Sequence, residues 1–203
     1  MIRIVDYSLG NILAFQNMLK RLNVDVAIAR TAADLGDATR IILPGVGAFD
    51  HAMELLEASG MRPKLTELAL ERKVPTIGVC VGMQILAQGS DEGSRPGLGW
   101  IEGRVRHFSH LASSELHVPH MGWNDVTPES GNPLFAGLEQ EARFYFLHSF
   151  YFECAQAADV AARARYGIDF SCAVRRGNIH GVQFHPEKSH HFGAQLLKNF
   201  AEL

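Results

Sequence analysis

A cysteine lies between two glycines in the segment Gly78-Val79-Cys80-Val81-Gly82. The mostly apolar residues 74–77 precede it, so the pattern predicts a strand that turns sharply into a helix, with the thiol at the apex. Such a turn needs small residues two positions before and two positions after the nucleophile, because larger side chains would clash across it. A helix N-terminus also favours the thiolate form. The spacing therefore predicts that Cys80 is a nucleophile.

A nucleophilic cysteine needs a base and a group that orients the base. Both residue types occur in His185-Pro186-Glu187, directly after a strand pattern at 179–184. Pro186 keeps the chain extended, so we expect Glu187 to turn back to the imidazole at the end of a strand, where parallel sheets present their active sites. The order Cys80, His185, Glu187 follows the logic of α/β-hydrolase triads.

A third feature is a short glycine-rich segment, Pro44-Gly45-Val46-Gly47, which follows a strand pattern at 40–43. We assign an oxyanion hole to Val46, Gly47 and Val81, with the backbone N–H groups of Val46 and Val81 as donors. Removing one such donor typically lowers the rate about a hundred- to a thousand-fold. The alternative is that these glycines serve only a turn.

Alternating strand and helix patterns in the first 90 residues must position these groups. Strands are expected at 2–6, 24–29, 40–43 and 74–79, and helices at 11–22, 49–59, 64–72 and 84–87. Repeated units of this kind predict an α/β fold with a doubly wound, mostly parallel central sheet and helices on both faces.

The second half of the chain has a different pattern. Short strands are expected at 103–108, 144–152, 160–166, 171–175 and 179–184, and an amphipathic helix at 194–203. Successive short strands predict an antiparallel layer attached to the core. With no internal repeat or linker, residues 1–203 are expected to form a single domain.

Composition bounds the function. The chain has 203 residues, 47% of them hydrophobic and 20% charged, with a net charge of −3, which gives no footprint for nucleic acid or an anionic membrane. We expect no signal peptide and no membrane span. Three cysteines without a C-x-x-C pair suit a reducing compartment, so a cytoplasmic location is expected.

Two histidine pairs have a spacing that metal sites also use. They are His107-x-x-His110 and His117-x-x-His120. No cysteine or carboxylate completes either set, so we expect no metal and no cofactor.

At this point the motifs resemble a known family. Gly78-Val79-Cys80-Val81-Gly82-Met83-Gln84 with His185-Pro186-Glu187 is similar to the class I glutamine amidotransferases, whose glutaminase domains release ammonia from glutamine for a synthase. Within that class, segments along the whole chain resemble the glutaminase subunits of imidazole glycerol phosphate synthase, in histidine biosynthesis. These segments are Asp6-Tyr7-Ser8-Leu9-Gly10-Asn11, Pro44-Gly45-Val46-Gly47-Ala48-Phe49, Gly97-Leu98-Gly99-Trp100, Pro119-His120-Met121-Gly122-Trp123-Asn124, Tyr145-Phe146-Leu147-His148-Ser149 and Gln183-Phe184-His185-Pro186-Glu187-Lys188-Ser189.

The resemblance implies a role for each matching residue. Cys80 would attack the glutamine side-chain amide and form a thioester, His185 would carry the proton, and Glu187 would hold the tautomer of His185. Contacts with glutamine fall to Gln84, Glu92, His148 and Ser149. The surface and gate turned toward the partner fall to Pro119, Met121, Trp123, Asn124 and Lys188. The implied partner is a separate cyclase or synthase subunit in a heterodimer, reached by ammonia without contact with water.

Some residues depart from the family pattern. Ser8 and Leu9 replace a common Gly-Met pair, and Phe150 stands where tyrosine is frequent. The tail 188–193 is similar to a paralogous branch that supplies ammonia to an N-acetyl sugar amidotransferase in surface-polysaccharide synthesis. That branch is therefore an alternative pathway.

Two other functions compete with a glutaminase. One is a cysteine peptidase or esterase on the same elbow, in which Gln84 and Glu92 have no obvious role. The other is a non-catalytic regulatory subunit, which does not require the set Cys80, His185 and Glu187. Glutaminase subunits of the family that the chain resembles typically need the partner to complete the oxyanion hole. Because the Val46 peptide lies among glycines and could rotate between two states, we also expect weak or absent glutaminase activity without the partner.

Overall fold

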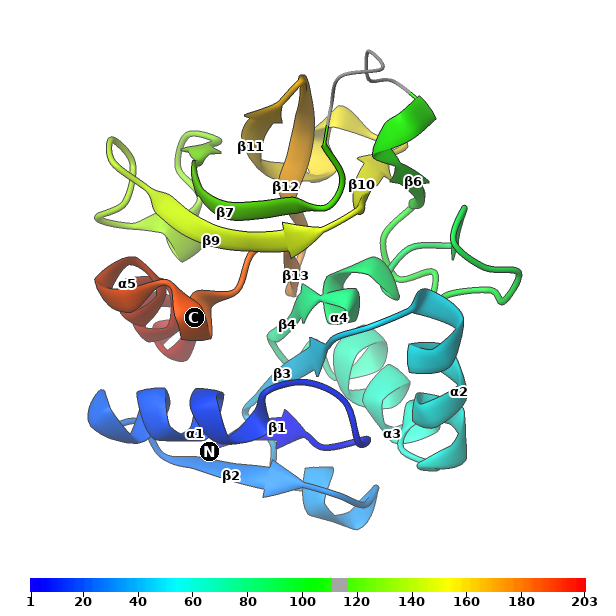
Figure 1. Ribbon diagram of the computed structural model, residues 1–203. Helices are drawn as coiled ribbons and strands as arrows, with labels where there is room; N and C mark the ends of the chain where they lie inside the picture. The colour runs from blue at the N-terminus through cyan, green and yellow to red at the C-terminus, as the bar shows by residue number, and fades with distance from the viewer. Residues whose placement is uncertain (111–116) are drawn as a thin grey trace.

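The computed structural model of the chain describes residues 1–110 and 117–203 (Figure 1). Within these residues the central sheet has eleven strands. Its path is β2 (Val26–Ala29), β1 (Ile2–Val5), β3 (Arg40–Gly45), β4 (Thr76–Cys80), β13 (Ile179–Val182), β12 (Ile168–Arg176), β10 (Phe150–Cys154), β6 (Gly103–His107) and β5 (Gly89–Ser90). β11 (Val160–Tyr166) pairs with β12, and β8 (Thr127–Pro128) pairs with β11.

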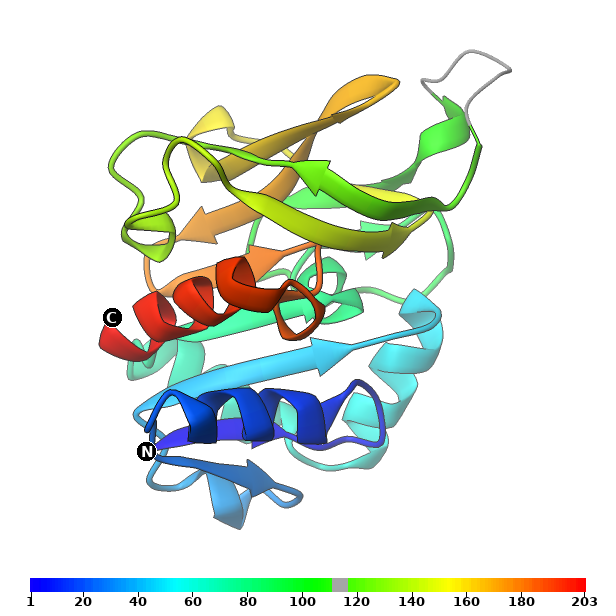
Figure 2. The same cartoon turned by 60° about the vertical axis from the view of Figure 1, so that its left-hand side comes forward.

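The five strands from β2 to β13 run parallel. Every residue of β4 is buried, as expected for a strand covered on both faces. α1 (Ile12–Arg21) and α5 (His190–Glu202) cover one face, and α2 (Phe49–Ala58) and α3 (Arg62–Thr66) cover the other (Figure 2). The predicted doubly wound arrangement is confirmed. It brings the carboxyl ends of β3, β4 and β13 to one edge of the sheet.

Short helical turns connect these elements. They are η1 (Ala33–Leu35), the π-helical η2 (Glu67–Glu71), η3 (Phe108–His110), η4 (Pro133–Phe135), η5 (Ala157–Asp159) and η6 (Pro186–Lys188). No helix in the described ranges is long and apolar enough to cross a membrane.

The antiparallel part extends the central sheet through β12, β10 and β6, and adds a separate ladder of β7 (His120–Asp125) and β9 (Arg143–His148). The prediction of one strand at 144–152 is wrong, because the chain leaves the ladder at Ser149 and enters the central sheet as β10. β7 was not expected. Its inward positions carry His120 and Asn124 in place of apolar residues, so its alternation is hidden from a hydrophobicity pattern.

The helix predicted at 84–87 is also wrong. α4 spans only Val81–Gln84. The amide of Ile85 makes a last helical bond to the carbonyl of Val81, and the amides of Leu86 and Ala87 make turn-like bonds to residues three positions earlier. The amide of Gln88 then donates to the carbonyl of Gly103 at 3.1 Å, which aligns β5 with β6. Sheet pairing therefore ends α4 after one turn, and so short a helix supplies little macrodipole to Cys80.

Aromatic side chains fill the space between the ladder and the central sheet. The rings of Phe144 and Phe184 stack with centroids 3.9 Å apart, and Phe146 and Phe170 meet edge to face at 6.1 Å. All four are essentially inaccessible to solvent. This core fixes β9, and with it His148, against the strand end that carries His185.

Candidate active site

Cys80 occupies the apex between β4 and α4, with φ +55° and ψ −115°. A positive φ at a residue other than glycine is strained, and such strain clusters at functional sites. A Cβ atom on Gly78 would collide with the backbone of Gly82, and a Cβ on Gly82 would collide with the carbonyl of Leu43. The structure therefore requires both glycines for the close backbone approach that the sequence pattern predicted.

His185 follows β13, and η6 turns the chain so that Glu187 faces the ring. Nδ1 of His185 lies 2.9 Å from Oε1 of Glu187, and the two side chains are 4% and 2% exposed. Burial by itself lowers the pKa of His185, but the interactions with Cys80 and Glu187 outweigh it and raise the pKa to about 9. The other ring nitrogen, Nε2, is buried and makes no hydrogen bond to a described residue. The ring is thus held on the Glu187 side and left open on the other.

The segment between β3 and α2 is anchored at both ends. The hydroxyl of Tyr7 donates to the carbonyl of Pro44 at 2.7 Å. The amide of Phe49, at the start of α2, donates to Oε2 of Glu92 at 2.8 Å. Burial raises the pKa of Tyr7, so this hydroxyl keeps its proton and remains a donor. Val46 and Gly47, two residues of the predicted oxyanion hole, lie between these two anchored positions in the sequence.

Those two residues, Val46 and Gly47, line the same pocket as Cys80 and Val81. Gly45 pairs with Cys80 across the parallel ladder, which places this segment beside the elbow. The side chain of Val46 is 41% exposed, and Gly47 has φ +86°, a conformation that glycine adopts readily. The structure brings the predicted oxyanion residues to the nucleophile, and their donor role stays a prediction.

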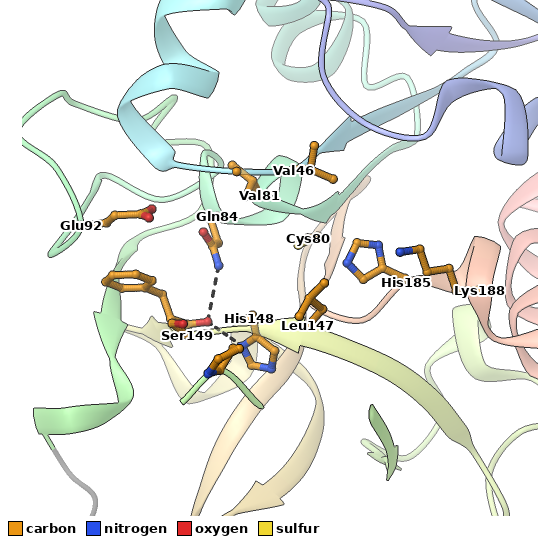
Figure 3. Close-up of a pocket in the computed structure, with 13 residues that line it drawn as sticks. Val46, Cys80, Val81, Gln84, Glu92, Leu147, His148, Ser149, His185 and Lys188 are labelled. Carbon is orange, nitrogen blue, oxygen red and sulfur yellow. Dashed lines mark hydrogen bonds between the residues drawn. The ribbon is translucent and has the colours of Figure 1, made fainter. Parts of the chain in front are cut away.

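A pocket of about 280 Å³ opens over the thiol (Figure 3). Its lining combines hydrogen-bonding groups with short apolar side chains, as expected for a small polar substrate. The lining residues are Val46, Gly47, Cys80, Val81, Gln84, Glu92, Pro119, Leu147, His148, Ser149, Phe150, His185 and Lys188.

The four residues expected to contact glutamine all belong to this lining. Gln84 is buried, and its side chain points toward the segment that carries Ser149 (Figure 3). His148 has both ring nitrogens engaged, with Nε2 2.9 Å from Nδ1 of His120 and Nδ1 2.7 Å from the carbonyl of Phe150. Burial lowers the pKa of His148 to about 3, so the ring is a neutral part of the pocket wall.

The residues expected to face a partner lie in three places. Met121 and Trp123 project from the outer face of the ladder, 65% and 41% exposed, and Lys188 and Pro119 line the pocket. Asn124 lies on the inner face, where its Nδ2 donates to the carbonyl of Arg165 at 2.9 Å. Asn124 therefore supports the ladder from within instead of presenting its amide outward.

The outer face of the ladder continues to the pocket. Leu147 is paired with Met121, is 38% exposed and also lines the pocket. Nζ of Lys188 lies 5.7 Å from the ring centroid of Tyr145, which neighbours Trp123 in the register. We call Met121, Trp123, Tyr145 and Leu147 the outer apolar face.

Three buried polar residues next to the site escaped the sequence analysis as functional groups. They are Tyr7, His120 and Gln183. Each belongs to a motif that carries the family resemblance, but the sequence predicted no catalytic or substrate-binding role for any of the three. The available signal was a polar side chain at a buried position, as for Gln183 in the apolar strand that leads to His185.

Comparison with known proteins gives the same family along the whole chain. A family model described as "Glutamine amidotransferase class-I" matches residues 3–203. The chain is 61% identical to "Imidazole glycerol phosphate synthase subunit HisH" of Bdellovibrio bacteriovorus and 53% identical to the protein of the same name from Leptospira interrogans, each over 100% of both chains. A crystal structure of a glutamine amidotransferase, 21% identical, has a TM-score of 0.76 and covers 99% of this chain and 97% of that chain, which shows the shared fold.

The buried thiol at a strained elbow, the histidine–glutamate pair beside it and the match over nearly every residue agree with one another. The chain belongs to the class-I glutamine amidotransferase family.

Proposed function

We propose that this chain is the glutaminase subunit of an imidazole glycerol phosphate synthase. The observation that carries the proposal is that Cys80 and His185 line one small pocket and that Glu187 bonds to the far side of the His185 ring. Glutamine hydrolysis needs a nucleophile, a base and room for a zwitterionic amino acid. Glu92 offers a carboxylate to the α-amino group of glutamine, and the segment of His148 and Ser149 receives the same α-amino and carboxyl end, so that the side-chain amide lies at Cys80.

The proposed reaction uses the pocket residues in order. The thiol of Cys80 transfers its proton to Nε2 of His185, and the sulfur attacks the side-chain amide carbon of glutamine. The negative oxygen of the tetrahedral intermediate receives hydrogen bonds from the amides of Val46 and Val81. His185 returns the proton to the departing nitrogen, so ammonia leaves and a thioester remains. Water, activated by His185, then releases glutamate.

Glu187 acts on the base instead of the substrate. It accepts a hydrogen bond from Nδ1 of His185 and stabilises the imidazolium that forms in each half-reaction. The raised pKa of His185 suits this role, because the ring keeps the proton while the sulfur is charged.

The proposed partner is a separate cyclase subunit that uses the ammonia, in a heterodimer. The outer apolar face offers a docking surface that reaches the pocket through Leu147 and Lys188. Ammonia delivered across such a contact avoids protonation in bulk water. The relatives reported above are named for imidazole glycerol phosphate synthase, so we propose that partner instead of a sugar amidotransferase.

The remaining parts of the proposal concern the whole chain. One glutaminase domain accounts for residues 1–203, and a cytoplasmic location suits a nucleophilic thiol that must remain reduced. A cysteine peptidase is a weaker candidate, because a pocket of about 280 Å³ suits an amino acid better than a polypeptide.

Glutamate release from glutamine tests the proposal. It is measured for the chain alone, with an imidazole glycerol phosphate cyclase subunit and its nucleotide ligand, and for Cys80→Ala in both conditions. Strong stimulation that disappears in Cys80→Ala is expected. Equal turnover with and without the cyclase subunit contradicts the proposed partner, and glutamate release by Cys80→Ala contradicts the proposed nucleophile.

A further inference from the structure

The thiolate of Cys80 gains little from the macrodipole of α4, because α4 is a single turn, so hydrogen-bond donors beside the sulfur matter more. One donor is in place. Nε2 of Gln183 lies 3.7 Å from Sγ of Cys80, within the range of hydrogen bonds to sulfur. Gln183 is 0% exposed and lies on the strand side of the thiol, in the segment between β13 and His185.

The orientation of the Gln183 carboxamide is determined by its neighbours. The carbonyl of Phe150 can only accept, so the group of Gln84 that lies 3.4 Å from it is the donor Nε2. The same Nε2 lies 3.1 Å from Gln183, which must therefore present its oxygen to Gln84. Its remaining group, the NH₂, then faces the sulfur of Cys80.

We propose that Gln183 is a catalytic residue that donates a hydrogen bond to the reacting sulfur of Cys80 and stabilises its thiolate. Gln84 and the Phe150 carbonyl are positioning groups that hold the donor toward the sulfur. A hydrogen bond to a charged acceptor is stronger than one to a neutral acceptor, so this contact favours the thiolate over the thiol. The inference rests on the proposed glutaminase chemistry and adds the group that prepares the nucleophile.

The test is the pH dependence of Cys80 alkylation by iodoacetamide, with the modified peptide identified by mass spectrometry to separate it from Cys154 and Cys172. Gln183→Met keeps the length of the side chain and removes the donor. Gln183→Glu keeps an oxygen for Gln84 and places a carboxylate near the sulfur. The pH midpoint of alkylation is expected to rise by about one unit in Gln183→Met and further in Gln183→Glu.

Turnover gives a second readout. Because Gln183 does not line the pocket, both variants are expected to lower kcat for glutamine about ten-fold at neutral pH in the presence of the cyclase subunit, with a smaller change in KM. Gln195→Met is the matched control, since Gln195 bonds to Asn199 on α5 and does not line the pocket, and both readouts should be unchanged. Thermal unfolding establishes that each variant is folded.

Two results would overturn the inference. One is a wild-type alkylation midpoint in Gln183→Met, and the other is a lower kcat in both variants with no change in alkylation. The alkylation measurement uses neither glutamine nor a partner. It therefore separates failure of this inference from failure of the proposed glutaminase activity.

Discussion

Nδ1 of His120 and Nε2 of His148 lie 2.9 Å apart, and both rings are buried. The Phe150 carbonyl accepts from Nδ1 of His148, so Nε2 of that ring accepts from His120. Nε2 of His120 in turn accepts from the Asn124 amide at 3.2 Å. The two rings are therefore neutral, each with one tautomer.

Acid is expected to destabilise the protein below about pH 6.5. Burial lowers the pKa of His120 to about 4, of His148 to about 3 and of His180 to about 4. In the unfolded chain the pKa values of these rings return to about 6.5. Between pH 6.5 and 4 the unfolded state therefore binds protons that the folded state does not. The free energy of unfolding then falls by at most about 1.4 kcal/mol per pH unit for each ring.

His185 is expected to act in the opposite direction. Its folded pKa of about 9 exceeds the unfolded value of about 6.5, so its stabilisation is complete below pH 6.5 and is lost as the pH rises through 9. Urea unfolding from pH 4.5 to about 8.5 should show maximal stability near pH 6.5, and His185→Gln should lose most of the decline on the alkaline side, because the raised pKa values of the buried thiols Cys154 and Cys172 reduce stability mainly above about pH 8.5. Stability that keeps rising from pH 6 to pH 4.5 would contradict the neutral state of the buried rings.

Removing the strain at the nucleophile should stabilise the protein. Cys80→Gly and Cys80→Ala both remove the sulfur, but only glycine accepts φ +55° without strain. We expect Cys80→Gly to be more stable than Cys80→Ala by about 1–2 kcal/mol in urea unfolding, with both variants inactive on glutamine. Equal stability of the two variants would show that the elbow stores no strain.

The anchor of residues 44–49, which include the proposed oxyanion donor Val46, is tested by Tyr7→Phe, which removes the hydroxyl that bonds to the carbonyl of Pro44. The variant is expected to lose about 1–2 kcal/mol of stability. We also expect it to lose about ten-fold in partner-stimulated kcat, because a misplaced donor stabilises the oxyanion less well. Tyr166→Phe removes a hydroxyl that bonds to the His117 carbonyl at the same 2.7 Å. Tyr166 does not line the pocket, and the variant keeps the ring that stacks on His120, so kcat should stay within two-fold. Equal kcat values for both variants would show that the Tyr7 hydroxyl makes no contribution to catalysis.

Charge on the outer apolar face should weaken docking of the cyclase subunit. Met121→Glu is expected to raise the dissociation constant at least about ten-fold, since it places an unpaired carboxylate in a buried contact. Leu70→Glu is the control, because Leu70 is another exposed apolar residue and lies on η2, in a different part of the fold. Binding is measured by isothermal titration calorimetry. Unchanged affinity in Met121→Glu would exclude this face as the docking surface.

The parts of the fold that could be predicted are those where local pattern and burial agree. The parallel strands are continuously apolar, and the glycines around Cys80 are required by backbone contacts within a few residues. β7 could not be predicted, because His120 and Asn124 are paired with partners distant in sequence. The length of α4 was likewise decided by a remote strand, β6, through the bond from Gln88 to Gly103.

The site residues, too, divide into those that local sequence motifs predict and those whose contacts are with residues distant in the sequence. Cys80, His185 and Glu187 belong to local motifs, and the fold brings them together. Gln183 and Tyr7 act on atoms 103 and 37 positions away in the sequence, so their contacts emerge only when the strands align.

The alternation along β9 separates two kinds of evolutionary change. Tyr145 and Leu147 project outward, whereas the alternate residues Phe146 and His148 are buried on the inner side of β9. A substitution that adapts the outer positions to a different synthase leaves the inner positions in place, because neighbouring side chains on a strand occupy opposite faces. An insertion of one residue in β9 would exchange the two sets. Substitutions at the outer positions of β9 can therefore change which synthase binds, whereas the number of residues in β9 must stay constant.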